Sequence, residues 1–124
     1  MPDFLRKVER ARDIPGTRFL HVLAPCPVGW GFPAQDLVDV AREAVDTGLW
    51  HLAEYEGPAV SGAPGGAFKL NRVPKGFAPV EPYLARQRRF AGLDAADVAT
   101  IEAARDARWE LMRSRWMADE KGGA

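Results

Sequence analysis

The chain has 124 residues, 47% of them hydrophobic, which is enough for one small domain with a modest core. Lysine plus arginine and aspartate plus glutamate number 17 each, so no net charge favours nucleic acid or an acidic membrane surface. One cysteine cannot form an intramolecular disulfide, and no apolar run approaches the roughly 20 residues of a membrane span. We therefore expect a soluble cytoplasmic protein that has no nucleic-acid or membrane partner.

The N-terminal part predicts a short helix followed by a strand. The helix should cover residues 4–13, because Asp3 can cap it and Leu5 and Val8 share one face. Residues 17–24 are almost continuously apolar, which is typical of a strand covered on both faces. Such a strand, placed so soon after a short helix, suggests the last α/β portion of a longer protein.

The middle of the chain predicts a second helix and a second strand. Residues 33–47 carry apolar side chains at the spacing of one helix face, at positions 37, 40, 41, 44 and 45. Residues 49–56 should form the strand, which gives a β-loop-α-β unit with a right-handed crossover. Residues 57–66 contain four glycines and two prolines, so we expect a flexible loop there.

The C-terminal part predicts a short strand and two helices. Residues 67–73 should return as a hairpin beside the preceding strand, and residues 80–90 should form a short helix. Asp94 and Asp97 have the spacing of a capping box at the start of the last helix. We expect residues 119–124 to fray, and residues 1–124 to form a single α/β domain with helices at its C-terminal end.

Two features of the last two helices invite interpretation. A stripe that includes Trp109 and Trp116 should pack on polypeptide outside this chain, since an exposed stripe of this size would be sticky. The basic run from Arg86 to Arg89 could dock an acidic ferredoxin or a phosphate of coenzyme A. A solvated helix face is the more frequent role of such a run, with Arg89 as a structural anchor.

The only cysteine, Cys26, lies in the loop between the first strand and the second helix, where ligands bind in open α/β sheets. Pro25 and Pro27 restrict the backbone on either side and make this loop stiff. A lone cysteine is most often a buried, inert thiol. A catalytic nucleophile would need a neighbouring base, and His21 and His51 lie in no recognisable motif and are expected to be structural.

The segment from Phe19 to Trp30 reads Phe-Leu-His-Val-Leu-Ala-Pro-Cys-Pro-Val-Gly-Trp. It resembles a motif late in the thiamine-diphosphate-binding (beta) subunit of 2-oxoacid:ferredoxin oxidoreductases of the pyruvate synthase type. The similarity covers nearly the whole chain and continues through residues 40–50, 54–56, 79–84, 87, 89 and 90. The order and spacing of these pieces are more specific than any one piece. Val28 is a departure, because the family often has a hydroxyl residue there.

The resemblance implies that Cys26 is the fourth ligand of a 4Fe-4S cluster beside thiamine diphosphate and its magnesium ion. It also implies that Pro25, Pro27, Gly29 and Trp30 belong to the wall of the cofactor pocket. The family's other cluster thiolates come from an upstream Cys-x-x-Cys and one further cysteine, and a Gly-Asp-Gly segment anchors magnesium and diphosphate. None of these occurs in the sequence, so the chain alone cannot hold a cluster.

The resemblance therefore implies the C-terminal portion of a beta subunit in a hetero-oligomeric oxidoreductase. Such an enzyme oxidatively decarboxylates pyruvate or a related 2-oxoacid to acyl-CoA and passes electrons to ferredoxin. We expect the chain to be catalytic only with other subunits or with the N-terminal portion of the same subunit. The alternative is a non-catalytic interaction or assembly protein that kept the fold and lost the cluster.

Glu54 and Glu56 alternate on the second predicted strand, so their carboxylates should share one face. Two carboxylates on one face could act as an acid/base pair. A solvated or salt-bridged pair is the more frequent arrangement, and we expect it here.

Overall fold

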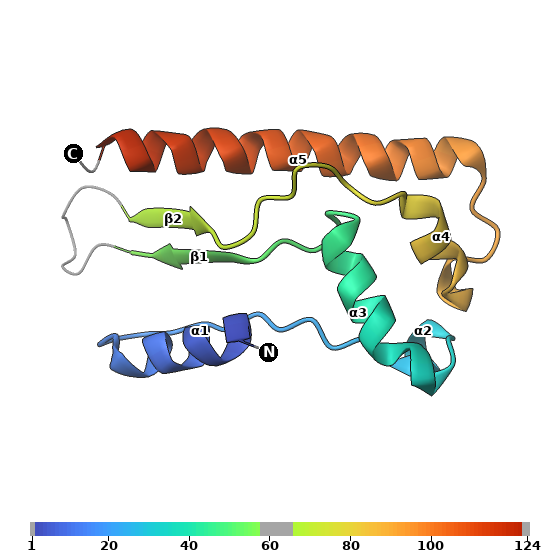
Figure 1. Cartoon of the computed structure of the whole chain (residues 1–124), viewed down its shortest axis with the longest axis horizontal. Helices are drawn as coiled ribbons and strands as arrows, with labels where there is room; N and C mark the ends of the chain where they lie inside the picture. The colour runs from blue at the N-terminus through green and yellow to red at the C-terminus, as the bar shows by residue number, and fades with distance from the viewer. Residues whose placement is uncertain (1, 58–65, 123–124) are drawn as a thin grey trace.

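The computed structural model describes residues 2–57 and 66–122 (Figure 1). With η for a 3-10 helix, the elements follow in the order α1 (Pro2–Asp13), α2 (Pro27–Trp30), η1 (Ala34–Asp36), α3 (Leu37–Asp46), β1 (Ala53–Glu56), β2 (Ala67–Leu70), α4 (Val80–Ala85), η2 (Arg88–Phe90) and α5 (Ala95–Gly122). The expected flexible loop at residues 57–66 falls almost entirely outside the described residues.

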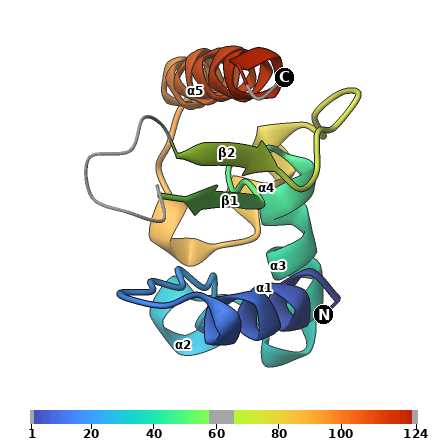
Figure 2. The same ribbon diagram turned by 90° about the vertical axis from the view of Figure 1, so that its left-hand side faces the viewer.

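The architecture is α/β, as expected, with helices arranged around one antiparallel hairpin. The register places Ala53 opposite Leu70 and Glu56 opposite Ala67, which confirms the hairpin although both strands are shorter than the sequence predicts. Figure 2 shows three layers, with α5 above the hairpin and α1 below it. Among the described residues, no helix is both long enough and apolar enough to cross a bilayer.

The predicted helices are formed, except that the one over residues 80–90 is divided into α4 and η2 by an extended Gln87. The start of α5 shows why its sequence is helical. The Asp94 Oδ1 atom accepts hydrogen bonds from the backbone N–H groups of Ala96 and Asp97, at 2.8 and 2.9 Å. The Asp97 carboxylate accepts in return from the Asp94 N–H at 3.0 Å, which completes the capping box. The helix continues to Gly122, into the segment for which we expect fraying, and the fraying itself stays a prediction.

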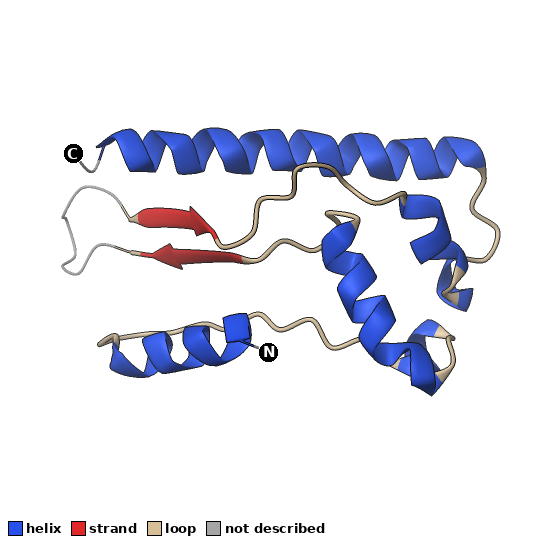
Figure 3. Ribbon diagram, in the orientation of Figure 1, coloured by secondary structure: helices blue, strands red, loops and turns tan. Residues whose placement is uncertain are grey.

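The strand predicted over residues 17–24 is not formed, and this prediction is wrong for the described chain. Figure 3 shows the whole stretch between α1 and α2 as loop. No backbone hydrogen bond joins residues 17–25 to any other part of the described chain. A strand exists only when a neighbour completes its ladder, and the β-loop-α-β unit is therefore absent here.

The core consists of two clusters of buried side chains. The first brings α3 and α4 together around residues 32, 40, 44, 80, 83 and 84. The second joins α5 to the hairpin through Leu70, Trp109 and Met112, with Trp116 packed at its edge. The stripe on α5 thus covers the chain's own hairpin, which corrects our expectation that it faces other polypeptide.

The C-terminal end of α3 joins the two clusters. The indole N–H of Trp109 donates to the Gly48 carbonyl at 2.8 Å, and Arg105 donates to the Thr47 carbonyl at 3.3 Å. Gly48 has a φ of 75°, and a Cβ there would lie 2.5 Å from the ring of Phe77. Side chains of α5 therefore donate to the carbonyl at the C-cap of α3 and to the carbonyl of the residue that follows it.

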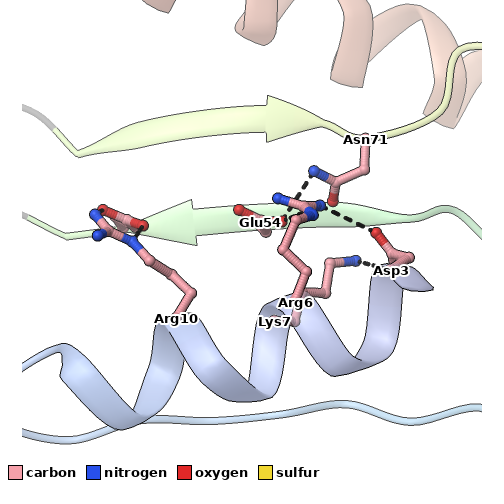
Figure 4. Close-up of polar contacts among 7 residues, drawn as sticks. Asp3, Arg6, Lys7, Arg10, Glu54 and Asn71 are labelled. Atoms are coloured by element: carbon pink, nitrogen blue, oxygen red, sulfur yellow. Dashed lines mark hydrogen bonds and ion pairs between the residues drawn. The ribbon is translucent and has the colours of Figure 1, made fainter. Parts of the chain in front are cut away.

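Ion pairs attach α1 to β1 (Figure 4). Arg6 contacts Glu54 at 2.7 Å, and Arg10 contacts Glu56 at 2.8 Å. The expectation that the two carboxylates are salt-bridged is thus confirmed. The hydrogen bond from Arg10 is the main cause that lowers the pKa of Glu56 below its ordinary value of 4.5, and the same contact raises the pKa of Arg10.

We predict that Trp109→Phe lowers the free energy of unfolding by about 1–3 kcal/mol, because it leaves the buried Gly48 carbonyl without its donor. Urea denaturation followed by circular dichroism measures this loss. The matched control is Trp116→Phe, since within the described residues the Trp116 indole N–H makes no hydrogen bond. An equal loss in both variants would show that ring size, not the hydrogen bond, matters.

We predict that Arg10→Gln moves the pKa of Glu56 back towards 4.5. The lowered pKa means that the pair stabilises the fold above this ordinary value, and that the contribution disappears as the pH falls through the lowered value. An NMR titration of the Glu56 carboxyl measures the shift. Arg12→Gln is the control, because Arg12 pairs only with its exposed neighbour Asp13, and it should leave the titration unchanged.

Candidate functional site: the loop around Cys26

Cys26 occupies the position immediately before α2, with extended φ and ψ of −101° and 109°. Pro27 follows as the first helical residue, where its fixed φ suits the turn and its missing N–H costs nothing. The N–H of Trp30 donates to the Cys26 carbonyl at 2.8 Å, and that of Gly29 donates to the sulfur at 3.3 Å. The short helix thus fixes both the backbone and the sulfur of Cys26.

The sulfur of Cys26 is accessible. Pro25 is buried beside it, whereas Cys26 itself is exposed. The interpretation of a lone cysteine as a buried, inert thiol is therefore wrong for this chain. The site combines an anchored backbone with an exposed cysteine.

The guanidinium group of Arg89 packs on the ring of Trp30. The Cζ atom of Arg89 lies 3.6 Å from the centre of the Trp30 ring, a close cation–π contact. Gln87 is only 1% exposed, and its side chain accepts from Arg89 Nε at 3.0 Å while donating to the Tyr83 carbonyl at 2.8 Å. Arg89 is therefore the structural anchor that the sequence suggested.

The other two arginines of the basic run are exposed, and they also contact neighbouring elements. Arg86 reaches back to α3, where it contacts Glu43 at 2.9 Å and lies 3.6 Å from Asp36. The N–H of Arg88 donates to the Gly31 carbonyl at 3.1 Å, which fastens η2 to the loop. The run therefore connects the Cys26 loop with α3, while Arg86, Arg88 and Arg89 remain exposed, as expected of a solvated face.

Two surface hollows flank the loop. One, of about 460 Å³, is lined by Pro27, Gly31 and Arg88 among others. The second, of about 300 Å³, is apolar apart from Arg89 and includes Trp30 in its wall. Cys26 lines neither hollow. Pro27 and Trp30, which the resemblance assigns to one pocket wall, therefore border different hollows.

The two histidines pack against Trp50. The ring of His21 lies 4.7 Å from that of Trp50 in an edge-on arrangement, and the ring of His51 lies 6.4 Å away. Burial is the main cause that lowers the pKa of His51, and the charges of Arg108 and Lys7 add to it. Both histidines thus have aromatic partners, whereas the hydrogen bonds expected for them do not occur among the described residues.

The described residues contain no group of three or more His, Cys, Asp or Glu side chains that could hold a metal ion. The sequence predicted a strand-to-helix loop at Cys26, whereas the structure has no strand before it and makes Cys26 the cap of the short helix α2. It also missed the support that Gln87 gives to Arg89. The sequence did carry a signal for this support, because Gln87 and Arg89 are among the positions that resemble the family.

Comparison with curated proteins gives clear relatives. The chain is 36% identical over 110 residues to pyruvate synthase subunit PorB of Methanocaldococcus jannaschii, and 40% identical over 100 residues to that of Methanothermobacter marburgensis. It is 34% identical over 116 residues to ketoisovalerate oxidoreductase subunit VorB of Pyrococcus abyssi. These alignments cover 89%, 81% and 90% of the chain. No protein-family model matches it.

The same alignments cover only 34%, 32% and 34% of the relatives, so the chain spans about one third of their length. The relatives act on two different 2-oxoacids, according to their names, and the similarity extends to both. The chain therefore belongs to the family of 2-oxoacid:ferredoxin oxidoreductase beta subunits, of which it represents about one third.

Proposed function

We propose that the chain is a component of a 2-oxoacid:ferredoxin oxidoreductase and that Cys26 supplies one thiolate to its 4Fe-4S cluster. The observation that carries the proposal is the exposed sulfur of Cys26 on a rigid loop, inside the segment that resembles the family motif. The relatives named pyruvate synthase and ketoisovalerate oxidoreductase subunits support this function over that of a non-catalytic assembly protein.

The donor set fits one corner of a cluster. A 4Fe-4S cluster needs four thiolates, and the chain has one cysteine. Gly29 faces the sulfur, and a Cβ at this position would already lie 3.4 Å from Sγ. An alanine there would come into ordinary van der Waals contact with the sulfur. The remaining thiolates would come from another part of the subunit or from another subunit.

Each residue of the loop has a separate task in this proposal. Cys26 holds iron, and buried Pro25 keeps its backbone in place. Trp30, fixed by Arg89, would contribute to the cofactor pocket from the second hollow, and Pro27 and Gly29 shape the turn. When bound, thiamine diphosphate with its magnesium ion supplies the decarboxylation chemistry, and the cluster carries single electrons.

The partners follow from the same proposal. The chain corresponds to the C-terminal portion of the beta subunit and works in the cytoplasm within a hetero-oligomer. The complete enzyme binds a 2-oxoacid and coenzyme A and passes its electrons to ferredoxin.

The turn after α2 requires glycine at position 31. Gly31 also connects this turn to η2. Gly31 has a φ of 74°, in the left-handed region that favours glycine. A Cβ there would lie 2.6 Å from the Cβ of Arg88, a distance that forces the backbone apart. The close approach places the Arg88 N–H on the Gly31 carbonyl, so the presentation of Cys26 depends on this glycine.

We predict that Cys26→Ala abolishes the cluster in the assembled enzyme without preventing assembly. The chain would be produced together with the polypeptide that carries the Cys-x-x-Cys and Gly-Asp-Gly segments. Electron paramagnetic resonance of the reduced complex measures the cluster, and its signal should disappear in the variant. Val28→Ala, a change at an exposed neighbour, should keep the signal. An unchanged signal in Cys26→Ala would exclude Cys26 as a ligand.

We predict that Gly31→Ala lowers the free energy of unfolding by about 1–3 kcal/mol, because the strained backbone and the contact with Arg88 both oppose the native turn. Gly29→Ala is the matched control and should change it by less than about 0.5 kcal/mol. Urea denaturation of the two variants measures the difference. Equal losses would mean that the left-handed turn does not hold the loop.

A further inference from the structure

The sulfur of Cys26 accepts a hydrogen bond from its own loop. The backbone N–H of Gly29 donates to Sγ, and the nitrogen and the sulfur lie 3.3 Å apart. Within the described residues this is the one hydrogen bond that the sulfur makes. A neutral thiol is a weak acceptor, whereas an acceptor that carries negative charge binds a donor about twice as strongly. The contact is therefore best suited to the thiolate form of Cys26, which is the form that binds a metal.

The turn of α2 fixes the direction of this N–H. Pro27 begins the turn with a restricted φ, and its carbonyl accepts from the N–H of Gly31 at 2.9 Å. The N–H of Trp30 donates to the Cys26 carbonyl, which holds the residue that carries the sulfur. The N–H of Gly29 therefore points at Sγ before any metal is bound, and it needs no reorganisation when the thiolate forms.

Position 29 accommodates a small side chain beside the sulfur. A Cβ on Gly29 would lie 3.4 Å from Sγ and 3.6 Å from the Cβ of Cys26, and both distances are ordinary contacts. An alanine at this position therefore keeps the N–H and adds one methyl group. A proline has no N–H and is tolerated in the first turn of a helix. The two substitutions thus separate the hydrogen bond from the volume of the side chain.

We propose that the Gly29 N–H raises the reduction potential of the 4Fe-4S cluster to which Cys26 would donate its thiolate. This inference rests on the proposed function. Hydrogen bonds to the ligating sulfurs are among the factors that set the potential of a cluster, and reduction adds one electron and so one negative charge. A donor aimed at Sγ stabilises the more negative, reduced state more than the oxidised state. Gly29 is thus a positioning residue that acts through the sulfur of Cys26.

Redox titration of the assembled enzyme measures this effect. The complex with the polypeptide that carries the Cys-x-x-Cys and Gly-Asp-Gly segments is equilibrated at a series of potentials, and electron paramagnetic resonance gives the reduced fraction of the cluster. At a given potential, Gly29→Pro should shift the ratio of reduced to oxidised cluster about tenfold towards the oxidised form, which is about 59 mV for a one-electron couple. Gly29→Ala is the matched control, and its titration should overlay that of the unsubstituted complex.

Two further measurements distinguish the N–H from the shape of the turn. Replacement of the amide at position 29 by an ester removes the N–H without introducing a ring, and it should shift the titration in the same direction. Pulsed electron paramagnetic resonance after exchange into D2O should detect a deuteron coupled to the reduced cluster in the unsubstituted complex and in Gly29→Ala. This coupling should be missing in Gly29→Pro and in the ester, and the ester decides if the proline variant does not assemble.

The outcomes separate this inference from the proposed function. Titrations of the proline and ester complexes that match the unsubstituted one, with the cluster present, would overturn the inference and leave the function standing. A shift in Gly29→Ala equal to that in Gly29→Pro would show that side-chain volume, not the N–H, sets the potential, and would also overturn it. A cluster that forms equally well in Cys26→Ala would overturn the proposed function and this inference with it.

Discussion

The C-terminal end of α3 is the point on which the remaining structure depends. A helix ends with carbonyl groups that lack intrahelical donors, and burying them unpaired would be costly. Arg105 and Trp109 of α5 donate to the carbonyls of Thr47 and Gly48, and the positive charge of Arg105 also suits a helix C-terminus. The same face of α5 packs on the hairpin, so one set of contacts positions α3, α5 and both strands.

The Cys26 loop is connected to this centre through α4 and η2. Tyr83 and Leu84 of α4 lie in the cluster that holds α3, and buried Gln87 continues from α4 to Arg89. Arg89 covers Trp30, while Arg88 approaches Gly31 closely. An open thiol can therefore be held rigidly in a small chain, because its support comes from side chains that follow it by about 60 residues along the sequence.

The sequence predicted the helices well, because their apolar period and the Asp94–Asp97 capping box are local signals. It predicted a strand at residues 17–24 that is not formed, since a ladder needs a neighbouring strand and the described residues offer none to this segment. The resemblance identified Cys26, but exposure of its sulfur and the contact between Arg89 and Trp30 depend on tertiary packing. The four-residue helix α2 is too short for any periodic signal.

Ion pairs attach α1 to the rest of the described chain, whereas α3, α4 and α5 pack through the two apolar clusters. Phe4 and Leu5 face solvent, and charged pairs with Glu54 and Glu56 join α1 to β1. Such pairs are screened by dissolved ions, whereas the apolar clusters are not weakened by them. The choice of buffer therefore governs whether α1 stays docked, and concentrated salt would free it while the body around α3 and α5 remains intact.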